Sequence, residues 1–307
     1  MRSRYLWRRL VALPLILLCA SFLIFLAVRL LPGDPARLLA GMQADEGTVT
    51  AMRERLGLDK PILTQYGLFL GRVLKGDLGQ SNRSAEPVRQ EIATRFPYTA
   101  ALTISAFGFA ILLGVPAGCF AAIYKSTWID STVLFGSIAG GSVPNYWLAL
   151  MAMELLGVQL GWLPLMGAGS LRNYILPALT LGLAPGTVIA RMTRGSMLEI
   201  LAQPYILTAW AKGLGPWRVY GKHALRNALL SIVTIVGMNF AGLLGGAVIT
   251  ETVFNWPGIG RLMVDAVRYR DYATVQGVTL LTVALVVGIN LLTDLLISFL
   301  DPRTRFA

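Results

Sequence analysis

The hydrophobic positions of the chain are pooled into long uncharged runs, and the charged residues lie between them. A run of about 20 apolar residues crosses the roughly 30 Å hydrocarbon core of a bilayer as an α-helix, which satisfies its backbone hydrogen bonds internally. Each run therefore predicts a transmembrane helix. The six runs, each 18 residues or longer, span 10–28, 97–124, 131–153, 173–190, 228–250 and 272–293.

Two of these runs have alternative interpretations. The fourth contains helix breakers, including Pro185 and Gly186, and we expect neighbouring helices to reseal its backbone. The first follows a basic start, which is also typical of a cleaved signal peptide. Its apolar core is longer than a signal peptide needs, and no small-x-small cleavage site precedes Arg29. We therefore expect it to remain as the first span.

Basic residues orient the spans, because short loops rich in Lys and Arg stay on the cytoplasmic side. With the N-terminus inside, the inner pieces hold 13 Lys or Arg and the outer pieces hold 14, but ten of these 14 lie in the loop 29–95. A loop of that length falls outside the rule, and without it the balance is 13 inside against four outside. The prediction is a multi-pass protein of the cytoplasmic (inner) membrane with both termini in the cytoplasm.

Composition agrees with a membrane protein. Of the 307 residues, 55% are hydrophobic and 14% are charged, against roughly 25% charged in an average soluble domain. The net charge of +11 would suggest a nucleic-acid partner in a soluble protein, but the orientation signal accounts for it, and no basic cluster is interleaved with aromatic residues. We therefore predict an all-α integral membrane protein with six transmembrane helices and no nucleic-acid partner.

Two longer segments separate the runs. In the outer loop, apolar residues from Ile62 to Leu74 recur at helical spacing after Pro61, which predicts a small amphipathic helical subdomain. In the inner segment, Pro204 suits the first turn of a short helix and Gly213 its C′ position, and a second helix is expected from Pro216 onward. The expected parts are the N-terminus with the first span (1–31), a periplasmic loop subdomain (32–96) and a five-helix core (97–307) that carries the inner segment (191–227).

Catalytic and metal-binding chemistry has few residues available. His223 is the only histidine, so a multi-histidine metal site within the chain is excluded. Cys19 and Cys119 both lie in apolar runs, so no disulfide framework is indicated. The Walker A pattern, Gly-x4-Gly-Lys-Ser/Thr, does not occur. We therefore predict no enzymatic activity, no bound metal and no cofactor for this chain.

The inner segment carries a recognisable pattern. Residues 206–215 read ILTAWAKGLG and residues 222–230 read KHALRNALL. This resembles the coupling loop of binding-protein-dependent ABC importer permeases of the dipeptide, oligopeptide and nickel group, closest to the dipeptide or glutathione type. The family pattern Glu-Ala-Ala, three residues, Gly corresponds to Leu207, Thr208, Ala209 and Gly213, so the glutamate is absent, as it commonly is in the peptide branch. Ser231 stands where that branch usually has proline.

Other segments extend the resemblance along nearly the whole chain. The Gly258-x-Gly260 pattern within the fourth of them is by itself a weak phosphate-loop signal, because it lacks the strand and helix context. We instead expect Trp256 to anchor at the membrane interface, and Pro257 and Gly258 to turn the chain into a short outer helix. The segments read LPGDP at 31–35, LGLDKP at 56–61, GDLG at 76–79, ETVFNWPGIGR at 251–261, RDY at 270–272 and DPR at 301–303.

The resemblance implies the type I ABC importer permease fold and the partners of a one-way importer. A second, homologous and non-identical permease would pair with this chain, two cytoplasmic ABC ATPases would hold the ATP and Mg and bind the coupling loops, and a periplasmic or lipid-anchored substrate-binding protein would deliver the substrate. It also implies which residues couple to the ATPases. These are Leu207, Thr208, Ala209, Trp210, Lys212, Gly213, Leu214, His223, Arg226 and Asn227.

Polar side chains at the spans each have two interpretations. Because a charge at mid-bilayer costs about 2.5–3.5 kcal/mol, Glu154 either touches water near the outer end of the third span or has a role in the pathway or in locking the helix bundle. Asp294 is either a structural ion pair or cap, or a pathway group. Asn145 and Asn239 are candidate pathway-lining residues, although an Asn in a span more commonly hydrogen-bonds a neighbouring helix.

Two other classes of membrane protein are alternatives to the importer. A secondary transporter should show inverted repeats and coupling carboxylates at mid-bilayer, and a membrane-embedded enzyme needs clustered catalytic side chains near one face. The sequence shows no evident inverted repeat, its only candidate coupling carboxylates are Glu154 and Asp294, and it has few residues that could form a catalytic cluster. Among substrates of the resembled group, short peptides or glutathione are favoured over a nickel chelate.

Overall fold

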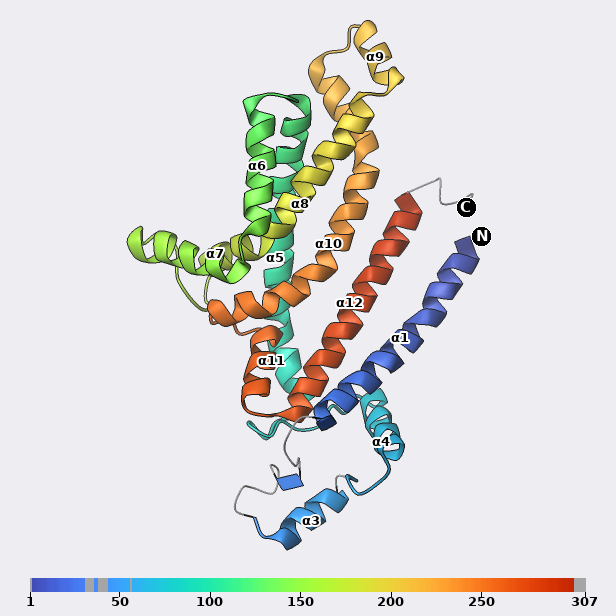
Figure 1. Ribbon diagram of the computed structural model, residues 1–307, viewed down its shortest axis with the longest axis vertical. Coiled ribbons are helices and arrows are strands. Elements are labelled where there is room, and N and C mark those ends of the chain that lie inside the picture. The colour runs from blue at the N-terminus through green and yellow to red at the C-terminus, as the bar shows by residue number, and fades with distance from the viewer. Residues whose placement is uncertain (1, 31–35, 38–43, 56, 301–307) are drawn as a thin grey trace. The chain divides into compact units, whose positions relative to one another are not determined.

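The computed structural model is built from helices joined by short connections, and it describes residues 2–30, 36–37, 44–55 and 57–300 (Figure 1). The family-like motifs at 31–35 and 301–303 lie outside these residues. The helices of the described part are α1 (Arg2–Leu30), α3 (Glu46–Arg55), α4 (Ile62–Leu74), α5 (Val88–Ile123), α6 (Trp128–Ser142), α7 (Asn145–Ala152), η1 (Met153–Gln159), η2 (Leu171–Tyr174), α8 (Ile175–Leu201), α9 (Pro204–Ala211), η3 (Arg218–Leu225), α10 (Arg226–Val253), α11 (Ile259–Arg268) and α12 (Tyr272–Leu300).

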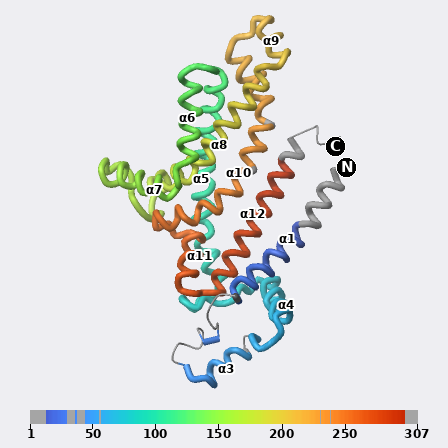
Figure 2. Tube along the Cα trace, viewed as in Figure 1, coloured from blue at the N-terminus to red at the C-terminus, as the bar shows by residue number. Residues whose placement is uncertain are grey.

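The chain divides into two compact units. The first unit contains residues 98–257 with the shorter pieces 2–6 and 288–300, and the second contains the described parts of 7–97 and 258–287. In the first unit, α8 packs along both α6 and α10 (Figures 1 and 2). Each unit therefore has its own set of packed helices.

Helices cover all six predicted spans. By length and apolar composition, four helical segments of the described part can cross a membrane: Val88–Ile123, Leu171–Leu201, Ser231–Val253 and Tyr272–Leu296. The first predicted span, 10–28, lies inside α1. The fourth predicted span is an uninterrupted helix despite Pro185. An all-α, multi-span membrane fold follows, as predicted.

The third predicted span, 131–153, is helical but not continuous. Helix α6 ends at Ser142, and Val143 adopts an extended conformation with φ −79° and ψ 125° before Pro144. Proline disfavours helical geometry in the residue that precedes it and cannot donate a backbone hydrogen bond. The prediction of one continuous helix is therefore corrected to α6, a bend, and a second helix, α7.

Helices α5 and α8 are joined along a line of small residues in the first unit. An ideal Cβ on Gly118 would lie 2.3 Å from the Ala190 carbonyl oxygen, and one on Gly182 would lie 2.4 Å from the Ala106 carbonyl oxygen. Distances this short leave no room for any side chain. Small residues that let two backbones approach are the usual basis of close helix packing in membranes.

Trp256 belongs to the core of the first unit rather than to a membrane interface, which corrects the expectation that it is an interfacial anchor. It is fully buried, its Nε1–H donates to the Tyr98 carbonyl oxygen at 3.1 Å, and its ring meets Tyr174 edge-on at 4.5 Å. Burial with the indole N–H satisfied is favourable for this large side chain. The predicted turn after it is present, since α11 begins at Ile259.

The second unit contains the predicted outer helix, α4, which begins directly after Pro61. Its Tyr66 and Phe69 pack against Phe25 of α1, with ring centroids 5.5 Å apart in each case. Elsewhere in this unit the buried Asp271 accepts hydrogen bonds from the Ser81 and Thr274 hydroxyls at 2.6 and 2.7 Å. Aromatic packing and a satisfied buried carboxylate thus hold this unit together.

Candidate functional site

The inner segment forms a short helix, α9, at the end of the first unit (Figure 1). Pro204 is its first residue, as predicted, because proline's fixed φ suits a helix start. Gly213 follows its last turn with φ +72°, and two backbone hydrogen bonds, Gly213 N–H to Trp210 and Leu214 N–H to Ala209, close the helix. This pair of bonds is a Schellman motif, which needs a left-handed residue where Gly213 stands.

The second half of the inner segment is continuous with a membrane span. The helical stretch η3 runs into α10 without a break, which differs from the expected separate short helix. On the other side, only Ala202 and Gln203 separate α8 from α9. A displacement of α9 would therefore be passed to both α8 and α10, which pack along each other.

Buried apolar residues fix α9 to the rest of the unit. Ile206 and Ala209 are 2% and 6% exposed and join a cluster with Met197 of α8 and Val219 of η3. Ala209, one of the residues predicted to couple to the ATPases, therefore faces the protein's own core and positions the helix. Leu214 packs against the same cluster.

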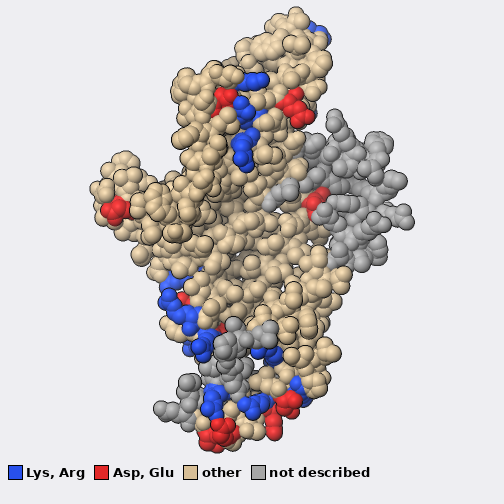
Figure 3. All heavy atoms as spheres, in the orientation of Figure 1, with Lys and Arg blue, Asp and Glu red and all other residues tan. Residues whose placement is uncertain are grey.

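The opposite side of α9 is exposed. Leu207 is 68% exposed, and Trp210 is 38% exposed with its ring edge-on to Tyr220. Thr208, Lys212 and Gly213 are exposed as well. Charged side chains gather at the α9 end of this unit, whereas the surface over α10 in the same view is largely uncharged (Figure 3). An apolar helix face, followed directly by the exposed Lys212, thus projects from this end.

The remaining predicted residues of the segment lie beside α9. Asn227 is exposed, and its amide donates to the Tyr205 hydroxyl at 2.8 Å and to the His223 carbonyl oxygen at 2.9 Å. His223 is half-buried and Arg226 is exposed. Asn227 and Tyr205 thus link the start of α9 to the start of α10. The role of Tyr205 was not predicted, because its partner lies 22 residues away in the sequence.

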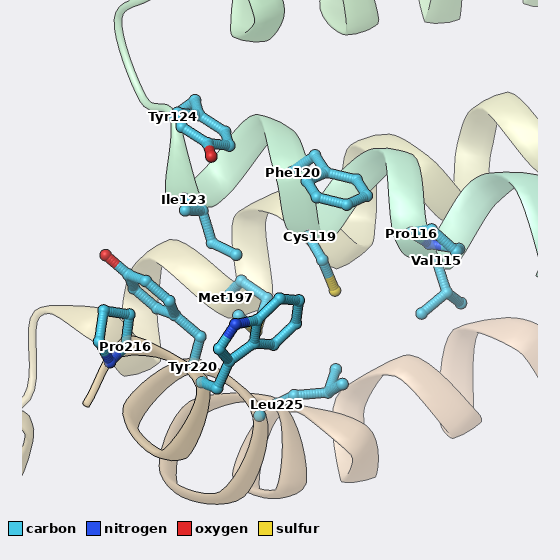
Figure 4. A pocket seen from close by; sticks show the side chains of 12 residues that line it. Val115, Pro116, Cys119, Phe120, Ile123, Tyr124, Met197, Pro216, Tyr220 and Leu225 are labelled. Carbon is cyan, nitrogen blue, oxygen red and sulfur yellow. The ribbon is translucent and has the colours of Figure 1, made fainter. Parts of the chain in front are cut away.

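An apolar groove of about 450 Å³ adjoins the segment (Figure 4). The Tyr124 and Tyr220 side chains lie toward one end of it, and Val115 and Pro116 toward the other (Figure 4). The groove is formed by the ends of α5 and α8 and by the chain from Pro216 to Leu225. Its remaining lining residues include Cys119, Phe120, Ile123, Met197 and Trp217.

An ion pair that was not predicted holds the α5–α6 turn to α8. The Arg194 guanidinium donates to both oxygens of Asp130, at 2.5 and 2.8 Å, and the Ser126 backbone N–H donates to the same carboxylate at 3.0 Å. These bonds, chiefly those from Arg194, hold the pKa of the Asp130 carboxyl below its usual value, although burial opposes them. The pair braces α8 shortly before α9 begins.

We expect Asp130→Asn to destabilise the protein by about 1.5–3 kcal/mol at neutral pH, because a hydrogen-bonded charge is lost. A carboxyl whose pKa is lower in the folded state adds stability above its unfolded pKa of about 3.9, and that stability disappears as the pH falls through the folded pKa. In thermal unfolding in detergent, the Tm of Asp130→Asn should therefore lie below that of the wild type at pH 7. In strong acid the two Tm values should be similar. In an Arg194→Gln background the same change should have little further effect; an equal loss there would rule out the pair as the cause.

The polar residues proposed within the spans have mainly local partners. Asn239 donates to the Ile235 carbonyl oxygen of its own helix at 2.8 Å, and Asn145 is the half-buried first residue of α7. Glu154 is exposed and accepts from the Gln159 amide at 3.3 Å, and Asp294 is half-buried in α12. Their roles in a pathway remain predictions. Within the described residues, no group of three or more His, Cys, Asp or Glu side chains could hold a metal ion.

The fold defines a class: a multi-span membrane protein with the type I ABC importer permease fold. A solved inward-facing structure of the MetNI methionine ABC transporter superposes with a TM-score of 0.58 at 20% identity, covering 69% of this chain and 97% of that chain. A second crystal form of the same transporter gives a TM-score of 0.57 at 22% identity, covering 68% and 96%. These likenesses establish the fold.

The chain belongs to the family of binding-protein-dependent transport system inner membrane components. The model for that family matches residues 114–306, and the model for its N-terminal part matches residues 2–103. Similar proteins are the glutathione transport system permease protein GsiC of Pectobacterium atrosepticum, 45% identical, and those of Salmonella typhimurium and Escherichia coli strain K12, 44% and 43% identical. Each alignment spans 302 residues, covering 98% of this chain and 99% of the relative.

The family defines the chain's general role. It is a multi-pass inner-membrane permease subunit of an ABC importer and not itself an enzyme. An importer of this kind works with ATPase and substrate-binding partners. The expectations of fold, family and non-enzymatic role are thereby confirmed.

Proposed function

We propose that this chain forms part of the membrane path for glutathione or closely related short peptides. The observation that carries the proposal is 43–45% identity over 98% of the chain to permeases named for glutathione transport. The sequence pattern of the outer loop and the inner segment, which resembles that of the dipeptide, oligopeptide and nickel group, also agrees with a short peptide as substrate. Nickel chelates are the alternative substrate.

The partners and topology proposed with it are those of a heteromeric importer. A second, non-identical permease pairs with this chain, two cytoplasmic ATPases carry the ATP and Mg, and a periplasmic or lipid-anchored binding protein supplies the peptide. Both termini face the cytoplasm, residues 32–96 form a periplasmic subdomain, and residues 97–307 form the permease core. In this arrangement α9 lies on the cytoplasmic side.

We further propose that α9 is the coupling helix. Its exposed residues Leu207, Thr208, Trp210 and Lys212 would enter a groove of the ATPase, as amphipathic helices commonly do. Ala209 and Leu214 support it from the core, and His223, Arg226 and Asn227 flank it at the start of α10. Since α9 is bounded by α8 and by η3 with α10, closure of the ATPases would move both spans together.

The test is purification of the tagged chain from its native membrane in mild detergent, followed by mass spectrometry and reconstitution into proteoliposomes. The expected result is stoichiometric recovery of ATPases and a second permease, with ATP-dependent glutathione uptake once the binding protein is added. Transport by the chain alone would overturn the importer assignment in favour of secondary transport. ATP-dependent uptake of a nickel chelate, without uptake of glutathione, would overturn the substrate.

A further inference from the structure

A second cavity, distinct from the groove beside α9, lies wholly within the second unit. Its volume is about 490 Å³, within the range of roughly 300–1,000 Å³ that small-molecule sites occupy. It is bordered by the end of α1, by α3 and α4, by the loop at 77–82 and by the start of α12. Its lining combines apolar side chains, such as Val28 and Phe69, with several polar ones.

Two arginines line this cavity, and neither forms an ion pair with a carboxylate among the residues that the structure describes. Arg29 donates from Nε to the Gln65 side chain at 2.7 Å, and its guanidinium lies 4.1 Å above the Phe25 ring. Arg72 has no side-chain hydrogen bond or ion pair to any residue that the structure describes. Both guanidinium groups thus bring a positive charge to the same cavity. Two positive charges at one cavity favour an anionic ligand.

Two buried donors line the same cavity from α12. The Tyr272 hydroxyl and the Gln276 side-chain amide nitrogen are buried and have no hydrogen-bond partner among the described residues, and Tyr272 is only 7% exposed. A buried polar group without a partner is costly, and native structures rarely leave one. A ligand with acceptor oxygens would satisfy both groups.

One acidic side chain completes the charge pattern. Asp77 lines the cavity, and one of its oxygens accepts the Gly79 backbone N–H at 2.9 Å. Two guanidinium groups and one carboxylate complement a molecule that carries two carboxylates and one ammonium group. Glutathione has this set of charges at neutral pH, whereas an unsubstituted dipeptide has one of each and a metal cation would be repelled by the arginines.

On the basis of the proposed function, we propose that this cavity is a binding site for the transported peptide, selective for a peptide with two carboxylates and one ammonium group. Arg29 and Arg72 each bind a carboxylate, and Asp77 binds the ammonium group. The Tyr272 hydroxyl and the Gln276 amide donate to the peptide's oxygens. The apolar walls at Val28 and Phe69 accommodate the rest of the molecule.

The experiment measures binding of radiolabelled glutathione to the purified complex in nanodiscs, without ATP and without the binding protein. Arg72→Gln removes one exposed guanidinium and should raise the Kd at least about tenfold, because charge-assisted bidentate hydrogen bonds are among the stronger ones. Tyr272→Phe should weaken binding less. Binding of Ala-Ala, measured in parallel, should change less than that of glutathione in Arg72→Gln.

Arg89→Gln is the matched control, since Arg89 is an exposed arginine of the same unit that does not line the cavity. Equal glutathione affinity in Arg72→Gln and Arg89→Gln would overturn the inference while leaving the proposed function intact. A wild-type complex that hydrolyses ATP but imports no peptide would overturn the proposed function, and the inference with it. If Arg72→Gln weakens capture of the empty binding protein and leaves glutathione binding unchanged, the arginine serves a protein partner and the inference is wrong.

Discussion

Gly213→Trp is expected to abolish ATP-dependent uptake while the chain still inserts into the membrane and assembles with its permease partner. Gly213 has φ +72°, and an ideal Cβ there would meet no atom of the chain within 4 Å. The folded chain therefore tolerates the new side chain at the cost of backbone strain, about 1–2 kcal/mol for a left-handed residue. An indole at this position would project from the proposed ATPase-binding surface and prevent α9 from docking. Uptake into proteoliposomes measures the loss of transport, and co-purification of the ATPases measures the loss of docking at α9.

Two controls separate a blocked interface from strain in the backbone. Gly161→Trp places the same side chain at another exposed glycine with positive φ, +63°, and open space around it, but far along the sequence from α9. It should retain uptake. Gly213→Asn keeps a residue that tolerates the left-handed conformation and should retain much of the coupling. Normal uptake by Gly213→Trp, with ATPases bound, would count decisively against α9 as the coupling helix.

Much of the fold was predictable because the membrane imposes a simple length requirement on apolar helices. The ends of α9 were predictable as well, since Pro204 and Gly213 suit one conformation each and both act locally. The predicted helix of the outer loop coincides with α4 for the same reason. Where a feature depends on local backbone preference or on hydropathy alone, sequence reasoning succeeded.

Features that depend on distant partners were missed. The contact between Asp130 and Arg194 joins residues 64 positions apart, and no pattern in a single sequence pairs them. Trp256 was assigned to the membrane interface because aromatic residues are enriched there, but the carbonyl of Tyr98, 158 residues earlier, satisfies its indole N–H inside the core. The cavity lined by Arg29 and Arg72 likewise combines residues from separate helices. Each of these three features depends on contacts between residues that lie far apart in the sequence.

One overlooked pattern was present in the sequence. Ala106, Ala110, Gly114 and Gly118 recur every four residues on α5, and Gly182, Gly186 and Ala190 do so on α8. Residues four apart share one face of a helix. Gly182, Gly186 and their neighbours were considered only as helix breakers, whereas the structure uses them to bring two backbones together. This spacing of small residues in apolar helices could have predicted the α5–α8 contact.

Gly118→Leu should therefore prevent the first unit from folding correctly. The nearest atoms to a new Cβ are the Ala190 carbonyl oxygen at 2.3 Å and the Thr193 Cβ at 2.7 Å, so the obstacle is largely backbone and cannot rotate away. We expect a loss of more than about 3 kcal/mol, beyond the usual range for overpacked cores, because α5 and α8 must separate. Size-exclusion chromatography and thermal unfolding in detergent would report aggregation or a strongly lowered Tm.

Gly108→Leu is the matched control on the same helix, since a Cβ at Gly108 would meet nothing within 4 Å. It should fold as the wild type does, because leucine favours a helix more than glycine and has room at this position. A Gly118→Leu protein that matches Gly108→Leu in stability would mean that α5 and α8 do not approach this closely in the membrane. Since α8 leads to α9 through only two residues, a partly folded Gly118→Leu protein should also lose coupling before it loses insertion. That order of losses is expected if the α5–α8 contact keeps α8 rigid while α9 moves.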